Sequence, residues 1–219
     1  NSKIAVIENT QAVTSYSITR NKKLLFNEGV DYILQGDPDA QISNLYKASK
    51  KEIDWKTVPG LMSKEDINYN PVWNFGVDDL DTLAPPDWEA IKFSGYWDLR
   101  YAHAPAPEPF LAVMTSRGCP FDCAFCSVPA LSKRRWKAHS PEYTVNEMIS
   151  KKKQYNINDF QWEDLNPTTS NKRMDKIADL LISNKNKVNW RTASGTKIET
   201  MKEETLQKII DSGCKFLQE

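Results

Sequence analysis

Cysteine and histidine are scarce in this chain, which has four cysteines and two histidines among 219 residues. It also lacks any stretch near the roughly 18 uninterrupted apolar residues that a membrane-spanning helix requires. Lysine plus arginine (29) equals aspartate plus glutamate (29), so the net charge indicates no polyanionic partner, and nucleic acid is not expected. With 40% hydrophobic and 26% charged residues, the composition is that of an ordinary globular chain.

The two ends of the sequence suggest a fragment. The chain begins at Asn1 rather than Met, and it stops at Glu219 directly after a strand-like segment. A strand at the end of a chain leaves hydrogen-bonding groups of its ladder unpaired. We therefore expect this sequence to be part of a longer protein.

Three of the four cysteines, Cys119, Cys123 and Cys126, lie within eight residues in the spacing CxxxCxxC. Seven residue steps span about 25 Å when extended and far less when looped, so three thiolates can converge on one inorganic cluster. Electron-carrying ferredoxins use four cysteines per cluster, but Cys214 lies 88 residues beyond Cys126. A loop with three cysteines leaves one iron of a 4Fe-4S cluster open to a small chelating ligand.

Two other uses of these cysteines are disfavoured. Zinc sites usually collect four Cys or His ligands from paired short spacings, and His103 and His139 do not form such a pair. A disulfide needs an oxidising compartment, and no signal peptide is visible in the sequence. An iron–sulfur cluster is the interpretation that fits the spacing best.

From Pro109 onward, strand-like and helix-like segments alternate, which is typical of a parallel sheet with crossover helices. Strands are predicted over 110–115, 159–163, 188–193 and 214–218. A helix is predicted from the N-cap Ser140 to about Tyr155. Two further helices are predicted from apolar stripes at Met174, Ile177, Ala178 and Leu181, and at Leu206, Ile209 and Ile210. The cysteine loop follows the first of these strands directly, and loops at this edge carry the chemistry of βα barrels.

Upstream, residues 3–7 and 29–34 are predicted to be buried strands, with Ile42, Leu45 and Tyr46 on one face of a short helix. Residues 1–64 are therefore expected to be the end of an α/β unit. Residues 65–108 are rich in Pro, Asp and aromatic side chains and are interpreted as a linker.

The cysteine spacing, with Phe125 before the third cysteine and Ser116-Arg117-Gly118 before the first, resembles the radical S-adenosylmethionine (radical SAM) superfamily. The segments 29–36, 58–61 and 79–88 resemble the connection found in its cobalamin-binding-domain-containing subfamily. That subfamily usually has Gly-Glu-Gly-Glu where this chain has Gly36-Asp37-Pro38-Asp39. A Rossmann-like remnant that binds no ligand remains the alternative for this part of the chain.

The resemblance implies an α/β fold. Residues 109–219 would be the N-terminal half of a radical SAM catalytic domain, a partial (βα) barrel with the first three to four units. Residues 1–64 would be the C-terminal part of a Rossmann-like, cobalamin-binding-type domain, joined by the linker 65–108.

It also implies a site. Cys119, Cys123 and Cys126 would bind a 4Fe-4S cluster that cleaves S-adenosylmethionine reductively and generates a 5'-deoxyadenosyl radical. Phe125 would lie beside the adenine, Glu163 and Asp164 would meet the positive amino group of S-adenosylmethionine, and Ser194 would contact the same cofactor. No further catalytic residue is indicated.

The activity implied is that of a radical SAM enzyme, with a cobalamin-dependent methyltransferase or a cyclase as specific forms. The expected partners are a small-molecule substrate and an electron donor such as flavodoxin or ferredoxin, in the cytoplasm. One alternative is a tRNA methylthiotransferase, which needs a second cysteine cluster, whereas residues 1–108 contain no cysteine. The other is a non-catalytic iron–sulfur redox or sensing module, which placement of the loop at the barrel rim disfavours.

Overall fold

The computed structural model describes residues 2–8, 21–74, 76–98 and 109–218. It consists of two compact units, which are described separately below. The first unit comprises Asn1–Asp78 and Pro120–Arg135, and the second comprises Asp79–Cys119 and Trp136–Glu219.

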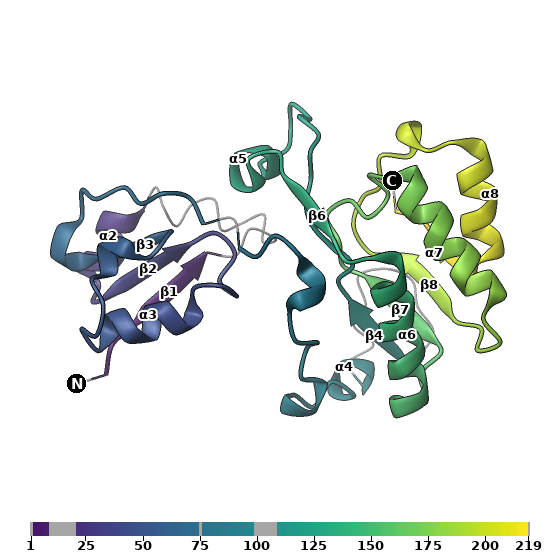
Figure 1. Ribbon diagram of the computed structural model, residues 1–219, viewed down its shortest axis with the longest axis horizontal. Coiled ribbons are helices and arrows are strands. Elements are labelled where there is room, and N and C mark those ends of the chain that lie inside the picture. The colour runs from purple at the N-terminus through teal and green to yellow at the C-terminus, as the bar shows by residue number, and fades with distance from the viewer. Residues whose placement is uncertain (1, 9–20, 75, 99–108, 219) are drawn as a thin grey trace. The chain divides into compact units, whose positions relative to one another are not determined.

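The first unit contains a small mixed sheet with the strand order β1-β2-β3 (Figure 1). β1 pairs in parallel with β2, and β2 pairs antiparallel with β3. Its strands are β1 (Ala5–Glu8), β2 (Tyr32–Gln35) and β3 (Leu61–Ser63), and its helices are α2 (Lys22–Asn27), α3 (Ile42–Ser49) and α5 (Val128–Ser132), with 3₁₀ turns η1 (Trp55–Thr57) and η2 (Lys64–Asp66).

β2 is buried on both faces because a different helix covers each one. Ile33 packs with Phe26 of α2, whereas Leu34 packs with Leu45 and Ala48 of α3. Parallel pairing with burial of both faces is typical of α/β folds. This confirms the α/β character predicted for this part of the chain.

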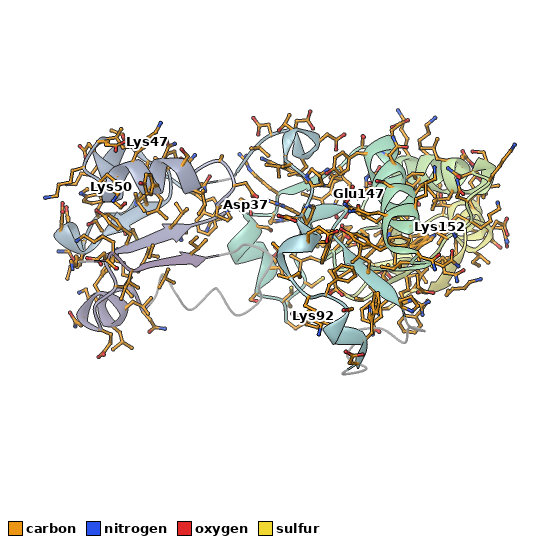
Figure 2. The ribbon with its side chains drawn as sticks, turned by 90° about the horizontal axis from the view of Figure 1, so that it is seen from below. Asp37, Lys47, Lys50, Lys92, Glu147 and Lys152 are labelled. Atoms are coloured by element: carbon orange, nitrogen blue, oxygen red, sulfur yellow. The ribbon has the colours of Figure 1, made fainter. Side chains whose placement is uncertain are left out.

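The inner face of α3 differs from the prediction. Leu45 is buried as expected, but Ile42 is 48% exposed and Tyr46 is 62% exposed. The helix instead turns Leu45 and Ala48 toward the sheet, and Lys47 and Lys50 project from its exposed surface (Figure 2). An apolar pattern over two turns of helix was too short to determine which side faces inward.

Gly36 follows β2 in a conformation that requires glycine. Its φ is +96°, in a region that residues with a Cβ rarely adopt, and a Cβ here would collide with the carbonyl oxygen of Asn74. Gly36 and Asn74 form an isolated parallel bridge. The Gly36-Asp37-Pro38-Asp39 turn is therefore packed closely against residues that follow β3 in the chain.

The second unit contains a parallel sheet with the strand order β4-β7-β8-β9. Three helices pack along one face of the sheet (Figure 1). The strands are β4 (Phe110–Val113), β7 (Asp159–Trp162), β8 (Asn189–Thr192) and β9 (Cys214–Phe216), and the helices are α6 (Pro141–Tyr155), α7 (Asn171–Ser183) and α8 (Glu203–Asp211). This arrangement confirms the predicted series of βα units.

The other elements of this unit are short. They are η3 (Leu80–Thr82), η4 (Trp88–Ala90), α4 (Gly95–Asp98), η5 (Ile198–Thr200) and the antiparallel ribbon of β5 (Ser116–Gly118) and β6 (Trp136–Ala138).

The core of the second unit lies between the sheet and its helices. Trp162 of β7 and Trp190 of β8 stack at a centroid separation of 4.3 Å, and both are fully buried. The predicted inner faces of α6 and α7 are confirmed, since the following side chains join this core: Val145, Met148, Ile149, Met174, Ile177 and Leu181. In α8, Ile209 is buried, but the prediction for Ile210 is wrong: it is 54% exposed, because successive helical residues point about 100° apart.

Several residues of the segment 79–98 also pack in this unit. Leu80 is buried, and Trp88, Phe93 and Trp97 pack against the core. The Trp97 indole Nε1 donates a hydrogen bond to the Phe110 carbonyl oxygen at 2.7 Å. Part of the predicted linker, residues 99–108, lies outside the described residues.

Within the described part of the chain, every helix is too short or too polar to cross a membrane.

Candidate functional site: the cysteine loop and its support

The cysteine loop is joined to the sheet by the β5–β6 ribbon. β4 ends at Val113, and after Met114 and Thr115 the chain enters β5, whose last residue, Gly118, pairs with Trp136 of β6. Gly118 has a φ of +79°, which favours glycine, so the backbone turns sharply just before Cys119. The loop thus begins at the carboxyl end of the first parallel strand, as the sequence predicted.

All four cysteines are reduced and partly exposed. Cys119 belongs to the second unit, whereas Cys123 and Cys126 belong to the first. The amide of Cys126 donates to the carbonyl oxygen of Cys123 at 3.0 Å, which forms a tight turn between these two cysteines.

The donor set of this loop fits an iron–sulfur cluster. Three reduced, accessible thiols in one short segment are the ligands that such clusters use. Among the described residues, no three His, Cys, Asp or Glu side chains are arranged around a common point that could hold a metal ion.

Phe125 is 94% exposed. The ring is therefore not packed beneath the loop, where its role would be purely structural. Its place between Cys123 and Cys126 leaves its face available for a planar ligand.

The basic residues after the loop make surface contacts. Arg134 lies 3.3 Å from Asp122, and both side chains are more than half exposed. The Lys133 ammonium lies 4.5 Å from the centroid of the Trp73 ring. Exposed pairs of this kind contribute little stability.

Asp164 lies two residues beyond β7 and is fully buried. Its carboxylate accepts hydrogen bonds from the Thr115 amide at 3.1 Å, the Thr115 hydroxyl at 2.9 Å and the Ser116 hydroxyl at 2.5 Å. Burial raises its pKa, an effect that the Ser116 and Thr115 hydrogen bonds and the charge of Arg173 oppose. In this conformation Asp164 has no surface for a ligand and instead holds the backbone at the entrance of the ribbon.

Glu163 and Ser194 lie after β7 and β8 at the same edge of the parallel sheet, and both are partly exposed. The Glu163 amide donates to the Val113 carbonyl oxygen at 2.8 Å, so its backbone is fixed beside β4. Glu163 also lines a cavity of about 370 Å³. Its other lining residues are mainly aromatic and aliphatic: Trp88, Ile91, Phe93, Tyr96, Trp97, Phe110, Leu111, Ala112 and Gln161.

Cys214 lies on β9, apart in sequence from the loop. Burial raises the pKa of its thiol to about 11, which disfavours the thiolate form that binds metals.

Two groups important for the support of the loop were not found from the sequence. Asp81 accepts a hydrogen bond from the Ser140 amide at 3.1 Å and contacts the His139 Nδ1 at 2.9 Å. Burial raises the pKa of Asp81, but the contacts with Ser140 and His139 outweigh this effect and lower it. Arg173 is buried near the start of α7. Nothing local in the sequence marks either residue, because their partners are 58 or more residues away for Asp81 and 29 or more for Arg173.

Comparison with known families assigns the second half of the chain. Residues 113–218 match the model described as the Radical SAM superfamily. A methyltransferase of Pyrococcus horikoshii, itself named as uncharacterized, is 26% identical over 187 residues, covering 84% of this chain and 39% of that protein. Cytidylyl-2-hydroxyethylphosphonate methyltransferase of Streptomyces wedmorensis is 27% identical over 139 residues, covering 62% of this chain and 26% of that protein. The chain therefore spans well under half the length of these relatives.

Solved structures share the fold. The methyltransferase TsrM from Kitasatospora setae, determined with cobalamin and a [4Fe-4S] cluster, matches with a TM-score of 0.71 at 16% identity, covering 96% of this chain and 41% of that chain. The cobalamin-dependent S-adenosylmethionine radical enzyme OxsB, determined with aqua-cobalamin and S-adenosylmethionine, matches with a TM-score of 0.65 at 20% identity, covering 87% of this chain and 26% of that chain.

Proposed function

Because the chain belongs to the radical SAM superfamily through residues 113–218, we propose that Cys119, Cys123 and Cys126 hold a 4Fe-4S cluster that binds S-adenosylmethionine. The observation that carries this proposal is the set of three reduced, partly exposed cysteines that follows the first strand of a parallel sheet. Loops at this edge of the sheet are where βα barrels place their chemistry.

The residues around the loop would orient S-adenosylmethionine. Phe125 presents an exposed ring on which an adenine can stack. The Glu163 carboxylate and the Ser194 hydroxyl are partly exposed at the same edge of the sheet, where they can hydrogen-bond a cationic amino group and a ligand oxygen. Asp164 acts through Thr115 and Ser116 rather than by touching the cofactor.

A cluster held by Cys119, Cys123 and Cys126 would supply the one-electron cleavage of S-adenosylmethionine into methionine and a 5'-deoxyadenosyl radical, with the electron coming from a flavodoxin or ferredoxin. The protein contributes orientation and exclusion of water. The partly apolar cavity beside Glu163 is the place at which a small-molecule substrate would be sheltered. The chemistry proposed is cytoplasmic, where reduced thiols persist.

Cobalamin is proposed as a second cofactor of the full-length protein, which would make it a methyltransferase or a cyclase. Supporting this, the likeness to TsrM covers 96% of the chain and so includes the first α/β unit. Residues 1–78 contain no histidine, however, so they offer no imidazole ligand to cobalt. Any contribution of this unit would be packing and hydrogen bonds around the ring.

Cysteine variants of the full-length protein test the cluster. After anaerobic reconstitution with iron and sulfide, C119A, C123A and C126A should each lose most of their bound iron and sulfide and all cleavage of S-adenosylmethionine. The matched control is C214A, which should keep wild-type iron because this cysteine lies on β9, 88 residues beyond Cys126 in the sequence. Retention of the cluster and of cleavage in C123A would overturn the proposal.

A further inference from the structure

One arginine, Arg173, binds both ends of the β5–β6 ribbon, which are called its legs below: Thr115 in the first leg and His139 in the second. The Arg173 Nε donates to the carbonyl oxygen of His139 at 2.9 Å, and its Nη2 donates to the carbonyl oxygen of Thr115 at 2.9 Å. Thr115 immediately precedes β5 and His139 immediately follows β6. The His139 amide also donates to the Thr115 carbonyl at 2.9 Å. The guanidinium therefore joins the segments through which the chain enters and leaves the cysteine loop.

Asp164 binds the first leg as well, through Thr115. It binds the amide and the hydroxyl of Thr115, while Arg173 binds the carbonyl of the same residue. Asp164 follows β7 and Arg173 lies in the first turn of α7, so a single βα connection supplies both groups. Every hydrogen-bonding group of Thr115 is thus held by that connection.

The surroundings of Arg173 are too polar and too closed for a simple packing role. Its side chain is 8% exposed, its Nη2 also donates to the Thr144 hydroxyl at 3.2 Å, and its guanidinium carbon lies 5.9 Å from the centroid of the Trp136 ring. Its Nη1 is buried with no hydrogen-bond partner among the described residues.

Burying such a charge opposes folding, since desolvation lowers the pKa of Arg173 to about 10, against the effect of Asp164 and Asp81. An apolar side chain would fill the same space at less cost. What arginine adds is a rigid planar fork that can bind several carbonyls in fixed directions, which a lysine ammonium cannot do.

We propose that Arg173 is a positioning residue for the cysteine loop. It fixes the spacing and direction of the two ribbon legs, and so the position and direction in which the loop starts at Cys119, directly after Gly118. This inference rests on the proposed function, because the position of the loop matters to a cluster only if the loop binds one. Arg173 acts through Thr115 and His139 and does not touch the cofactor.

The test uses R173K and R173Q in the full-length protein, with K176Q as the matched control. Lys176 lies on the same helix, but it is 54% exposed and its nearest carboxylate, on Glu142, is 3.9 Å away. Hydrogen exchange of the unloaded proteins is followed in peptides that cover 114–119, 136–140 and, as a reference, 159–162. Iron, sulfide and the electron paramagnetic resonance spectrum are then measured after anaerobic reconstitution.

We expect R173K to fold, to exchange at least tenfold faster in the two ribbon peptides than wild type, and to bind about half as much iron or less, with a broadened spectrum. R173Q should be affected more strongly, and K176Q should match wild type. Should R173Q fail to fold, R173K decides alone. Wild-type exchange, iron content and spectrum in R173K would overturn the inference.

The two proposals fail in different ways. If wild type itself binds no cluster, the proposed function is wrong, while the exchange of the unloaded proteins still shows whether Arg173 holds the ribbon. If wild type binds a cluster and R173K binds it equally well with an unchanged spectrum, only the positioning role is wrong.

Discussion

Substitution of Phe125 tests directly whether the cysteine loop contacts S-adenosylmethionine. A phenyl ring that is 94% exposed leaves apolar surface in water, and a planar ligand would cover it. Stacking of a base on an aromatic ring contributes about 1–3 kcal/mol. F125A should therefore weaken binding of S-adenosylmethionine to the reconstituted protein by about fivefold or more, with unchanged iron content.

Isothermal titration under anaerobic conditions measures this affinity. Tyr46, on α3, is 62% exposed and provides the control, since Y46A removes another exposed aromatic ring at a distance in sequence from the loop. Equal affinities of F125A and Y46A would show that the ring does not contact the cofactor.

The acidic residues after β7 show what a sequence reveals about single residues and what it does not. Position at the carboxyl end of a parallel strand follows from the βα pattern, and both Glu163 and Asp164 lie there. Their exposures differ because Asp164 turns toward Thr115, which is 49 residues away in sequence. Asp164 and Thr115 meet only because β4 and β7 pair in the folded protein, so no local sequence pattern could distinguish the two carboxylates.

At the scale of elements, Asp31 joins the strands of the first unit. It precedes β2, accepts a hydrogen bond from the Ile4 amide at 3.0 Å, and contacts the Lys3 and Lys64 ammonium groups at 3.1 and 2.6 Å. Lys64, the Ile4 amide and Lys3 hold the pKa of this carboxyl well below its usual range. Its stabilising contribution is therefore complete above the unfolded pKa of about 3.9 and is lost as the pH falls below that value.

D31N should lower the urea midpoint of the first unit at pH 7, because it removes the charge that both lysines contact. It should also flatten the loss of stability below pH 4. D66N is the control, since the Lys56–Asp66 pair is 46% and 41% exposed and contributes little. An unchanged midpoint in D31N, or an acid dependence like that of wild type, would contradict this role.

The sequence predicted the start and the buried face of some helices better than those of others. α6 begins with Ser140, whose hydroxyl accepts from the Tyr143 amide at 3.0 Å, so a local cap fixes its start. Its buried residues, Thr144, Val145, Met148 and Ile149, lie along one face of the helix. α3 and α8 are shorter, and Ile42, Tyr46 and Ile210 face solvent although their types suggested burial. With only two or three turns, the apolar pattern leaves the direction of the helix to tertiary packing.

For the whole molecule, the order of the βα units and the place of the cysteine loop could be predicted from the sequence, because both follow from local patterns. The division into two compact units could not be predicted from it. Residues 120–135 group with the first unit, although the strands on either side of them belong to the second. That grouping depends on contacts between segments distant in sequence, such as the cation–π contact of Lys133 with Trp73.

The central claim is that three cysteines hold a cluster with one iron open to S-adenosylmethionine. Electron paramagnetic resonance of the reconstituted, reduced full-length protein, recorded with and without S-adenosylmethionine, tests it most directly. We predict a 4Fe-4S signal whose g values shift when S-adenosylmethionine is added, because the open iron gains a new ligand. No cluster signal, or a signal that S-adenosylmethionine leaves unchanged, would contradict the account.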